Sequence, residues 1–147
     1  MTESAAMLLL LKDIAPESSL IPNATDPSRP AFLRWLMVIN AALYPTFAYS
    51  DVPERWVQGD EQAAGRLKTG VDDHRKTLLT VLEQHAVGPW FLGTQMSVLD
   101  LYFMTLRFWD PGLEWYASHV PTLDRIGYDI AEIEPVRQVR DHSCDPS

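Results

Sequence analysis

The sequence predicts an all-α fold, a bundle of helices with no complete sheet. Apolar residues recur at helical spacings of three, four and seven in several runs, and prolines and glycines separate these runs. No run shows the strict alternation of apolar and polar residues that is typical of a half-buried strand. The chain has 147 residues, of which 46% are hydrophobic, so it is long enough for one globular domain with a buried core.

The first helix is expected to begin after Thr2 and to end before Pro16. Thr2 is suited to cap the helix, Glu3 falls in its first turn, and a leucine-rich body follows. Residues 16–30 hold four prolines together with asparagine, aspartate and serine. This composition predicts a linker or an extended crossing, and therefore a candidate boundary.

A second, long helix is expected from the Asp-Pro-Ser segment at 26–28 to about residue 49. Between positions 31 and 43 only Arg34 and Asn40 are polar. A helix that is apolar all round must be covered on more than one side. Pro45 falls within this run, so a kink or a break is expected there.

Four further breaks define the remaining helices. A third helix is expected from about residue 60 to 86, where a Gly-Pro pair at 88–89 stops it. Its apolar stripe consists of Leu67, Val71, Leu78 and Leu82. Its other faces are charged and are expected to be solvated; they carry Glu61, Arg66, Lys68, Asp72, Asp73, Arg75 and Lys76.

The fourth helix is expected to be the central buried one. It is predicted to begin at Ser97 and to end at the Asp-Pro-Gly segment 110–112, and it has little polar surface. A fifth helix is expected at about 122–133, and Pro135 suits the first position of a last, short helix.

The segment from Phe91 to Asp100 contains the most specific local signal. Ser97 is predicted to cap the fourth helix, while the Asp100 carboxylate reaches back to the Ser97 N–H, an arrangement known as a capping box. Met96 precedes the cap and is expected to pack on Leu101 as a hydrophobic staple. Loss of a good cap costs about 1 kcal/mol.

Composition argues against several classes of function. The net charge of −8 disfavours nucleic acid and anionic membranes as partners. The apolar run at 7–11 is too short for a membrane span and lacks the basic start of a signal peptide. The one cysteine, Cys144, lies in a polar tail, which favours a reducing, cytoplasmic compartment. His142 and Cys144 supply only two of the four ligands of a zinc site, so no metal is expected.

With its Phe-Leu-Gly lead at 91–93, the Ser97–Asp100 box resembles the N-capping box and staple of the C-terminal helical domain of glutathione S-transferases. Leu99 stands where the family usually has alanine. Downstream residues that also match the family pattern are Pro121, Leu123, Tyr128, Glu132, Pro135 and Val136. The likeness covers most of residues 30–140. It implies a C-terminal-type helical domain at 31–141, a linker at 16–30 and a tail at 142–147.

A second motif, at residues 2–6, resembles the start of the last helix in the family's thioredoxin-like domain, so residues 1–15 are interpreted as a remnant of that helix. In the family an acid-Ser pair at this place binds the γ-glutamyl end of glutathione, which makes Glu3 and Ser4 the candidate glutathione contacts. A helix N-terminus offers N–H groups to a carboxylate, and a carboxylate such as Glu3 can pair with an ammonium group. The alternative is that both residues merely cap a helix.

The resemblance implies glutathione conjugation to small hydrophobic electrophiles. The family's catalytic Ser, Cys or Tyr and its cis-Pro loop belong upstream of Met1, so we expect a truncated chain, or one whose reading frame continues upstream, with no catalytic residue. The alternative is a non-catalytic binding, scaffold or dimerisation domain of the same type. Tyr44, Tyr49 and Trp109 are the expected lining of the electrophile pocket, although aromatic residues at helical spacing are more often core.

The resemblance also implies a partner, either a second copy of the chain or the thioredoxin-like domain. The second helix would then carry an exposed apolar face, which marks an interface. The residues expected on this face are Trp35, Leu36, Ile39, Leu43 and Phe47. The chain is therefore expected to self-associate.

Overall fold

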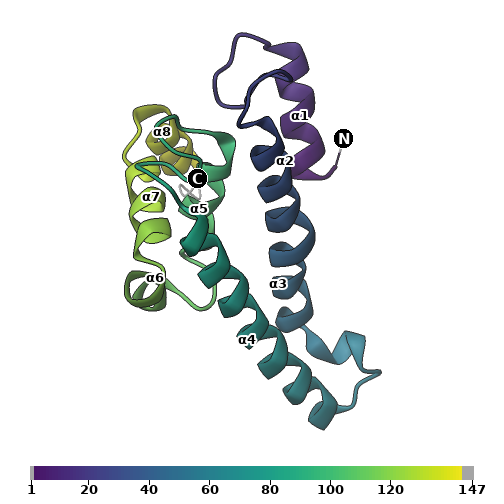
Figure 1. The fold of residues 1–147 in the computed structure, drawn as a ribbon. Coiled ribbons are helices and arrows are strands. Elements are labelled where there is room, and N and C mark those ends of the chain that lie inside the picture. Colours follow the sequence, from purple (N-terminus) through teal and green to yellow (C-terminus); the bar gives the residue numbers. More distant parts are fainter. Residues whose placement is uncertain (1, 144–147) are drawn as a thin grey trace.

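The computed structural model describes residues 2–143, and helices account for most of them (Figure 1). The helices are α1 (Ser4–Ile14), α2 (Arg29–Met37), α3 (Tyr44–Asp51), α4 (Glu61–His85), α5 (Val98–Leu106), α6 (Leu113–His119), α7 (Pro121–Ala131) and α8 (Glu134–Ser143). Within the described residues there is no strand, only an isolated bridge between Trp90 and Gly93. The predicted all-α fold is confirmed.

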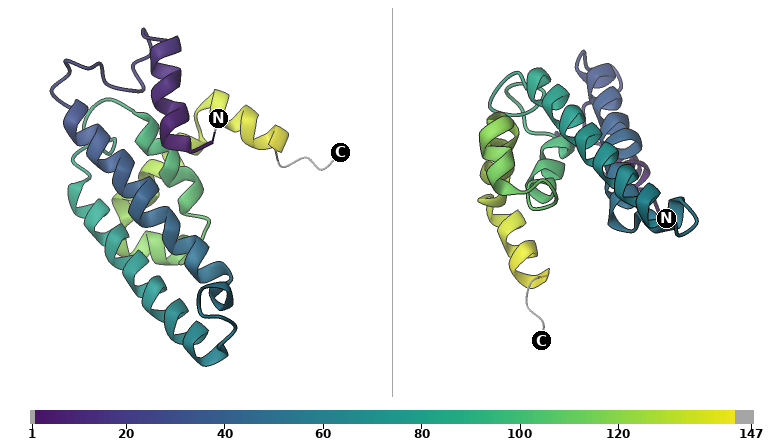
Figure 2. Two further views of the ribbon diagram at one scale, coloured as in Figure 1. Left: turned by 90° about the vertical axis from the view of Figure 1, so that its right-hand side faces the viewer. Right: turned by 90° about the horizontal axis from the view of Figure 1, so that it is seen from below.

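Two groups of helices pack against each other. Helices α2 and α3 form one continuous column that runs beside α4, and α5 to α8 gather on the other side of α4 (Figure 1). Helix α1 lies next to α2 at one end of the molecule, and α8 projects from the opposite group (Figure 2). Helices α5 and α7 pack closely against each other.

The apolar column of α2 and α3 is the core of the bundle. The sequence predicts an exposed face of five residues here, and this prediction is wrong, because each of the five is at most 8% exposed; they are Trp35, Leu36, Ile39, Leu43 and Phe47. Helices α4 and α5 contact the column and cover this face. By length and composition the run Arg29–Asp51 also meets the criteria for a membrane span, and one stripe of this run is buried in the core.

Pro45 does not break the column. A π-helical segment, Val38–Leu43, joins α2 to α3. The Tyr44 N–H donates to the Ile39 carbonyl, five residues earlier, so the turn before the proline is widened. A widened turn makes room for the proline ring, which otherwise clashes with the carbonyl four residues before it. The predicted break is therefore wrong, because a π-helical turn carries the helix past Pro45.

Several helix ends differ from the predicted ones. Helix α1 begins at Ser4, with Glu3 at the N-cap and no side-chain cap, so the predicted Thr2 cap is not formed. Helix α5 ends at Leu106, and the next residues form turns. Helix α6 was not predicted, because it is short and follows Gly112 without a side-chain cap. The N-terminus of α7 is capped from a distance, since the Glu83 carboxylate accepts the N–H groups of Thr122 and Leu123 at 3.0 Å each.

Helix α4 buries one charge that the sequence places on a solvated face. Arg75 is fully buried, so that prediction is wrong for this residue. Its Nε donates to Thr46 Oγ1 and one Nη2 hydrogen to the Thr46 carbonyl, both at 3.0 Å. Ser50 Oγ accepts from Nη2 and Asp110 from Nη1, and Asp72 forms an ion pair with Nη1. The guanidinium also lies over the Phe47 ring, 4.3 Å from its centroid.

Four of the five N–H donors of Arg75 therefore have a hydrogen-bond acceptor, and an ion pair joins Nη1 to Asp72. The hydrogen-bond and ion-pair partners come from α3, from α4 and from the turn after α5, and the arginine links these three parts. We expect Arg75→Met to lower the free energy of unfolding by about 4 kcal/mol, because the buried acceptors lose their cation. Arg75→Lys is expected to be intermediate, since an ammonium cannot replace the planar fork. Urea denaturation measures both.

The matched control for Arg75 is Arg66→Met. Arg66 is exposed on the same helix, and its loss is expected to change the unfolding free energy by less than about 0.5 kcal/mol. Equal losses in the two Met variants would contradict a structural role for the buried guanidinium.

A close approach of α5 and α7 requires Gly127. A Cβ at this position would lie 2.8 Å from the Phe103 carbonyl oxygen and 2.8 Å from Arg107 Cδ. We expect Gly127→Ala to cost about 2 kcal/mol, because α5 and α7 must move apart. Gly70→Ala on α4 is the control. A Cβ added at Gly70 meets nothing within 4 Å, so this change should raise the free energy of unfolding by about 0.5–1 kcal/mol. Thermal denaturation distinguishes the two, and a stable Gly127→Ala protein would refute the close approach.

Candidate functional site

The N-terminus of α1 is joined to the core by a polar cluster. Ser4 Oγ donates to Asn40 Oδ1 at 2.6 Å and lies 3.0 Å from Tyr102 Oη. Asn40 Nδ2 donates to Tyr102 Oη at 3.1 Å and to the Leu36 carbonyl at 2.9 Å. The cluster links α1, the π-helical segment and α5, which are far apart in the sequence. The Ser4 hydroxyl thus points into the protein, where it donates its hydrogen bond to Asn40.

The first turn of α1 leaves backbone donors available. Glu3 occupies the N-cap position, and its side chain makes no capping hydrogen bond. The first intrahelical bond is that of the Met7 N–H to the Glu3 carbonyl, so the preceding N–H groups of the turn have no partner within the helix. Glu3 itself has φ of 67°, a rare value for a residue with a side chain. Unusual backbone of this kind tends to occur at functional sites.

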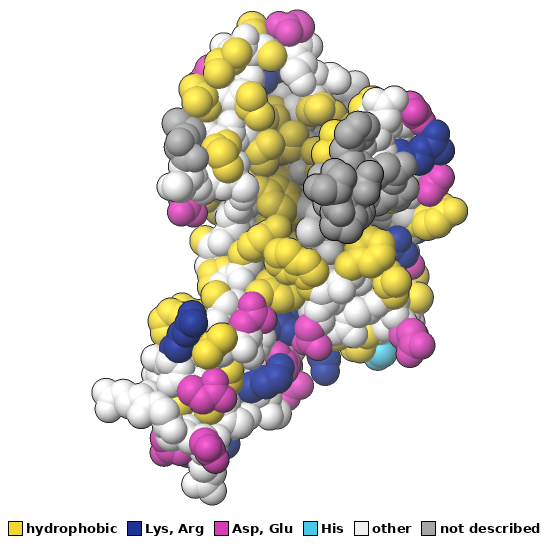
Figure 3. All heavy atoms as spheres, turned by 180° about the vertical axis from the view of Figure 1, so that it is seen from behind, with side chains coloured by type: hydrophobic (Ala, Val, Ile, Leu, Met, Phe, Trp, Pro, Cys, Tyr) yellow, Lys and Arg dark blue, Asp and Glu magenta, His cyan; other side chains and the backbone are white. Residues whose placement is uncertain are grey.

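An apolar cleft of about 390 Å³ opens beside this helix end. Its lining combines one face of α1 with residues of α5 and the start of α3: Ser4, Met7, Leu8, Leu11, Tyr44, Val98, Leu101, Tyr102 and Thr105. Figure 3 shows hydrophobic side chains gathered along a hollow on this side of the molecule. The volume lies within the range of about 300–1,000 Å³ that small-molecule sites usually have.

The predicted pocket aromatics divide into two groups. Tyr44 contacts Trp109 edge to face, with 5.6 Å between ring centroids, and Tyr102 at 5.8 Å. Burial, and to a lesser degree the neighbouring Tyr102, raises the pKa of the Tyr44 phenol, which is therefore a neutral hydrogen-bonding group at neutral pH. Tyr49 lies elsewhere and packs on Trp56, 4.7 Å away. Of the three predicted residues Tyr44, Tyr49 and Trp109, Tyr44 alone lines the apolar cleft directly.

The capping box of α5 contains a fully buried carboxylate, Asp100. The Ser97 N–H donates to Asp100 Oδ2 and the Phe91 N–H to Oδ1, both at 2.7 Å. Ser97 Oγ accepts the Leu99 N–H at 3.3 Å, so both halves of the box are present. Burial raises the pKa of Asp100, although the hydrogen bonds from Phe91 and Ser97 oppose the rise. Asp100 thus fixes the loop before α5 as well as the helix end.

Two residues of the polar cluster, Asn40 and Tyr102, do not appear among the predicted site residues. Asn40 carried a usable signal, because it is one of two polar residues in an otherwise apolar stretch and a buried amide needs partners. Tyr102 had no such signal, since in the sequence it cannot be distinguished from the other aromatic residues of a core helix. His142 and Cys144 lie outside the residues whose side chains the structure describes.

Comparison with known proteins places the chain among glutathione transferases. It is 34% identical over 140 residues to an uncharacterized GST-like protein, YncG, of Escherichia coli (strain K12), an alignment that covers 95% of this chain and 66% of that protein. The chain belongs to the glutathione S-transferase family. It is also 32% identical over 113 residues to glutathione S-transferase GST-4.5 of Xanthomonas campestris pv. campestris, covering 74% of this chain and 53% of that protein.

The chain therefore spans between half and two thirds of the length of these relatives. No family model matches it. Among solved structures, a ternary complex of BphK, a bacterial GST, has a TM-score of 0.73 at 22% identity, covering 97% of this chain and 68% of that one. A glutathione transferase family member from Pseudomonas fluorescens Pf-5, with two glutathione bound, also has a TM-score of 0.73, at 20% identity over 94% of this chain and 62% of that one. These likenesses show the shared fold.

We expect Asp100→Ala to destabilise the protein by about 4 kcal/mol, because it leaves the buried N–H groups of Phe91 and Ser97 without an acceptor. Asp73→Ala, an exposed change on α4, serves as the control and should stay within about 0.5 kcal/mol. Chemical denaturation of the two variants provides the comparison. A loss for Asp100→Ala of only about 1 kcal/mol would mean that the carboxylate acts as an ordinary exposed cap.

Proposed function

We propose that this chain is the helical part of a cytoplasmic glutathione S-transferase-like protein, and that it binds the γ-glutamyl end of glutathione at the N-terminus of α1. The observation that carries the proposal is the uncapped first turn of α1 at the mouth of the apolar cleft. The free N–H groups of this turn suit the ligand carboxylate. The Glu3 carboxylate suits its ammonium group.

The role of Ser4 in this proposal differs from the one that the family resemblance implies. Its hydroxyl hydrogen goes to Asn40, so Ser4 contributes its backbone N–H to the ligand and uses its side chain to hold the helix end in place. The apolar cleft, with Tyr44 at its wall, is the proposed place of the small hydrophobic electrophile. Conjugation itself needs a group that activates the glutathione thiol, which we assign to the part of the relatives that this chain does not match.

The second candidate function is a non-catalytic binding or dimerisation domain. Helix α1 favours it, because four large apolar side chains of this helix are at least 40% exposed: Met7, Leu10, Leu11 and Ile14. An apolar surface of this kind marks an interface. The proposed occupant is either a second copy of the chain or a thioredoxin-like domain.

Glutathione titration tests the first proposal. We expect isothermal titration to detect binding to the 147-residue chain, and Glu3→Gln to weaken it about ten-fold, because the carboxylate no longer pairs with the ammonium group. Ser4→Ala is expected to lower stability more than affinity.

The control for Glu3 is Glu61→Gln. Glu61 is an exposed acid in the first turn of α4, and its neutralisation should leave binding unchanged. An equal effect of the two Gln variants, or no heat of binding at all, would refute the proposed site. Clear turnover of an electrophile by this chain would instead refute the non-catalytic alternative.

A further inference from the structure

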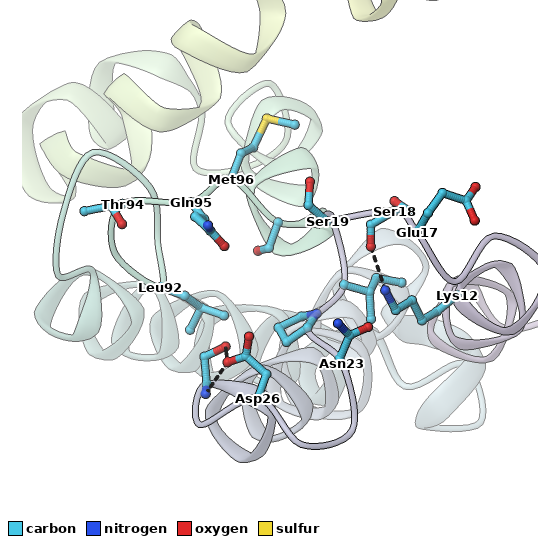
Figure 4. A pocket seen from close by; sticks show the side chains of 14 residues that line it. Lys12, Glu17, Ser18, Ser19, Asn23, Asp26, Leu92, Thr94, Gln95 and Met96 are labelled. Carbon is cyan, nitrogen blue, oxygen red and sulfur yellow. Dashed lines mark hydrogen bonds between the residues drawn. The ribbon is translucent and has the colours of Figure 1, made fainter.

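A second concave site lies away from the apolar cleft. It is a groove of about 350 Å³ between the crossing segment 16–28 and the loop 92–97 (Figure 4). The two walls come from stretches of the chain that about seventy residues separate, and the end of α1 closes one side through Lys12. We call this site the polar groove.

The walls of the polar groove are held by hydrogen bonds within the protein. Lys12 Nζ donates to the carbonyls of Pro16 and Ser18, both at 2.7 Å. The Val98 N–H donates to the Leu20 carbonyl at 2.9 Å and so joins the crossing segment to the start of α5. Arg29 Nη1 donates to the carbonyl of Pro22 at 2.7 Å. A ligand therefore meets a preformed groove and need not order its walls.

Uncharged polar side chains face this groove without partners. Those of Ser19, Asn23, Thr94 and Gln95 are exposed and have no hydrogen bond to any residue that the structure describes. Asn23 and Gln95 lie on opposite sides of the groove in Figure 4. Each carboxamide offers an acceptor oxygen and two N–H donors. A peptide unit has one N–H donor and one carbonyl acceptor, so a carboxamide can pair with both.

The other lining residues narrow the class of ligand. The lining also includes three apolar residues, of which Ile21 is buried and Leu92 and Met96 are half-buried. No lining residue is aromatic, so a base or a sugar ring has no surface on which to stack.

The charged groups of the lining narrow the class of ligand further. The lining carries two carboxylates, Glu17 and Asp26, and one ammonium group, that of Lys12, which two carbonyls already engage. The Ser28 hydroxyl and N–H donate to Asp26 and lower its pKa, so this carboxylate is ionised at neutral pH. An anionic ligand is therefore disfavoured.

We propose that the polar groove binds a short, extended, uncharged peptide segment, whose main-chain amide groups pair with Asn23 and Gln95. Main-chain hydrogen bonds supply the affinity in this mode of recognition, and small side chains of the peptide can contact Ile21 and Leu92. The site is independent of the glutathione site at the N-terminus of α1, because the two share no lining residue.

The test is an NMR titration of the ¹⁵N-labelled 147-residue chain with the blocked tripeptide acetyl-Ala-Ser-Ala-amide up to about 10 mM, a range suited to weak, millimolar binding. Saturable shifts of the amides at 19–28 and 92–97 are the expected result. The double variant Asn23→Ala/Gln95→Ala should lower the affinity about ten-fold, because two hydrogen-bonding side chains are lost. Its thermal midpoint should not change, since both residues are exposed.

Two comparisons make the result specific. Gln62→Ala removes an exposed carboxamide at the start of α4, at the far end of the molecule (Figure 1), and should bind the tripeptide as the unaltered chain does. Maltose replaces the tripeptide in a parallel titration and should cause no saturable shift. The proposal is overturned by the absence of saturable shifts with the tripeptide, by unchanged affinity of the double variant, or by tighter binding of maltose.

Discussion

The arrangement of helices around the apolar cleft depends on how one buried cation is satisfied. Arg75 lies fully buried on α4, where an ionised group is tolerated only if its donors are paired. Its hydrogen-bond and ion-pair partners belong to α3, to α4 and to the turn that begins at Asp110. Because the guanidinium is planar and its donors are fixed in direction, the three parts have little freedom to move relative to one another. Phe47, stacked on the cation, and Trp109, next to Asp110, then set the position of Tyr44.

A second buried charge supports the other end of the same helix group. Asp100 holds the loop at Phe91 and the N-terminus of α5, and α5 in turn presents Tyr102 to Ser4 and Asn40. The N-terminus of α1 is thereby attached to the bundle through polar contacts, while its apolar side remains open to the cleft. A helix end that is anchored but uncapped suits the binding of a carboxylate, and this combination links the fold to the proposed glutathione site.

Local patterns predicted much of the fold. Helical periodicity and the Pro and Gly breaks gave the all-α class and most helices, because both signals act within a few residues of the chain. The Ser97–Asp100 box was predicted for the same reason, since its two partners are only three residues apart. The predicted bounds failed where no local signal exists, as at α6, or where a proline was accommodated by a π-helical turn instead of a break.

The sequence by itself determined most of the helices, the capping box at Ser97 and Asp100, and the family to which the chain belongs. Tertiary structure alone decided which side of each helix is buried: it placed Arg75 inside, covered the apolar face of α2 and α3, separated Tyr49 from Tyr44, and turned the Ser4 hydroxyl towards Asn40. The physical reason is the distance along the chain between the groups that interact. A cap or a helical period needs only neighbours in sequence, whereas a buried cation, a covered face or a shared hydrogen bond needs partners that the chain brings together only when it folds.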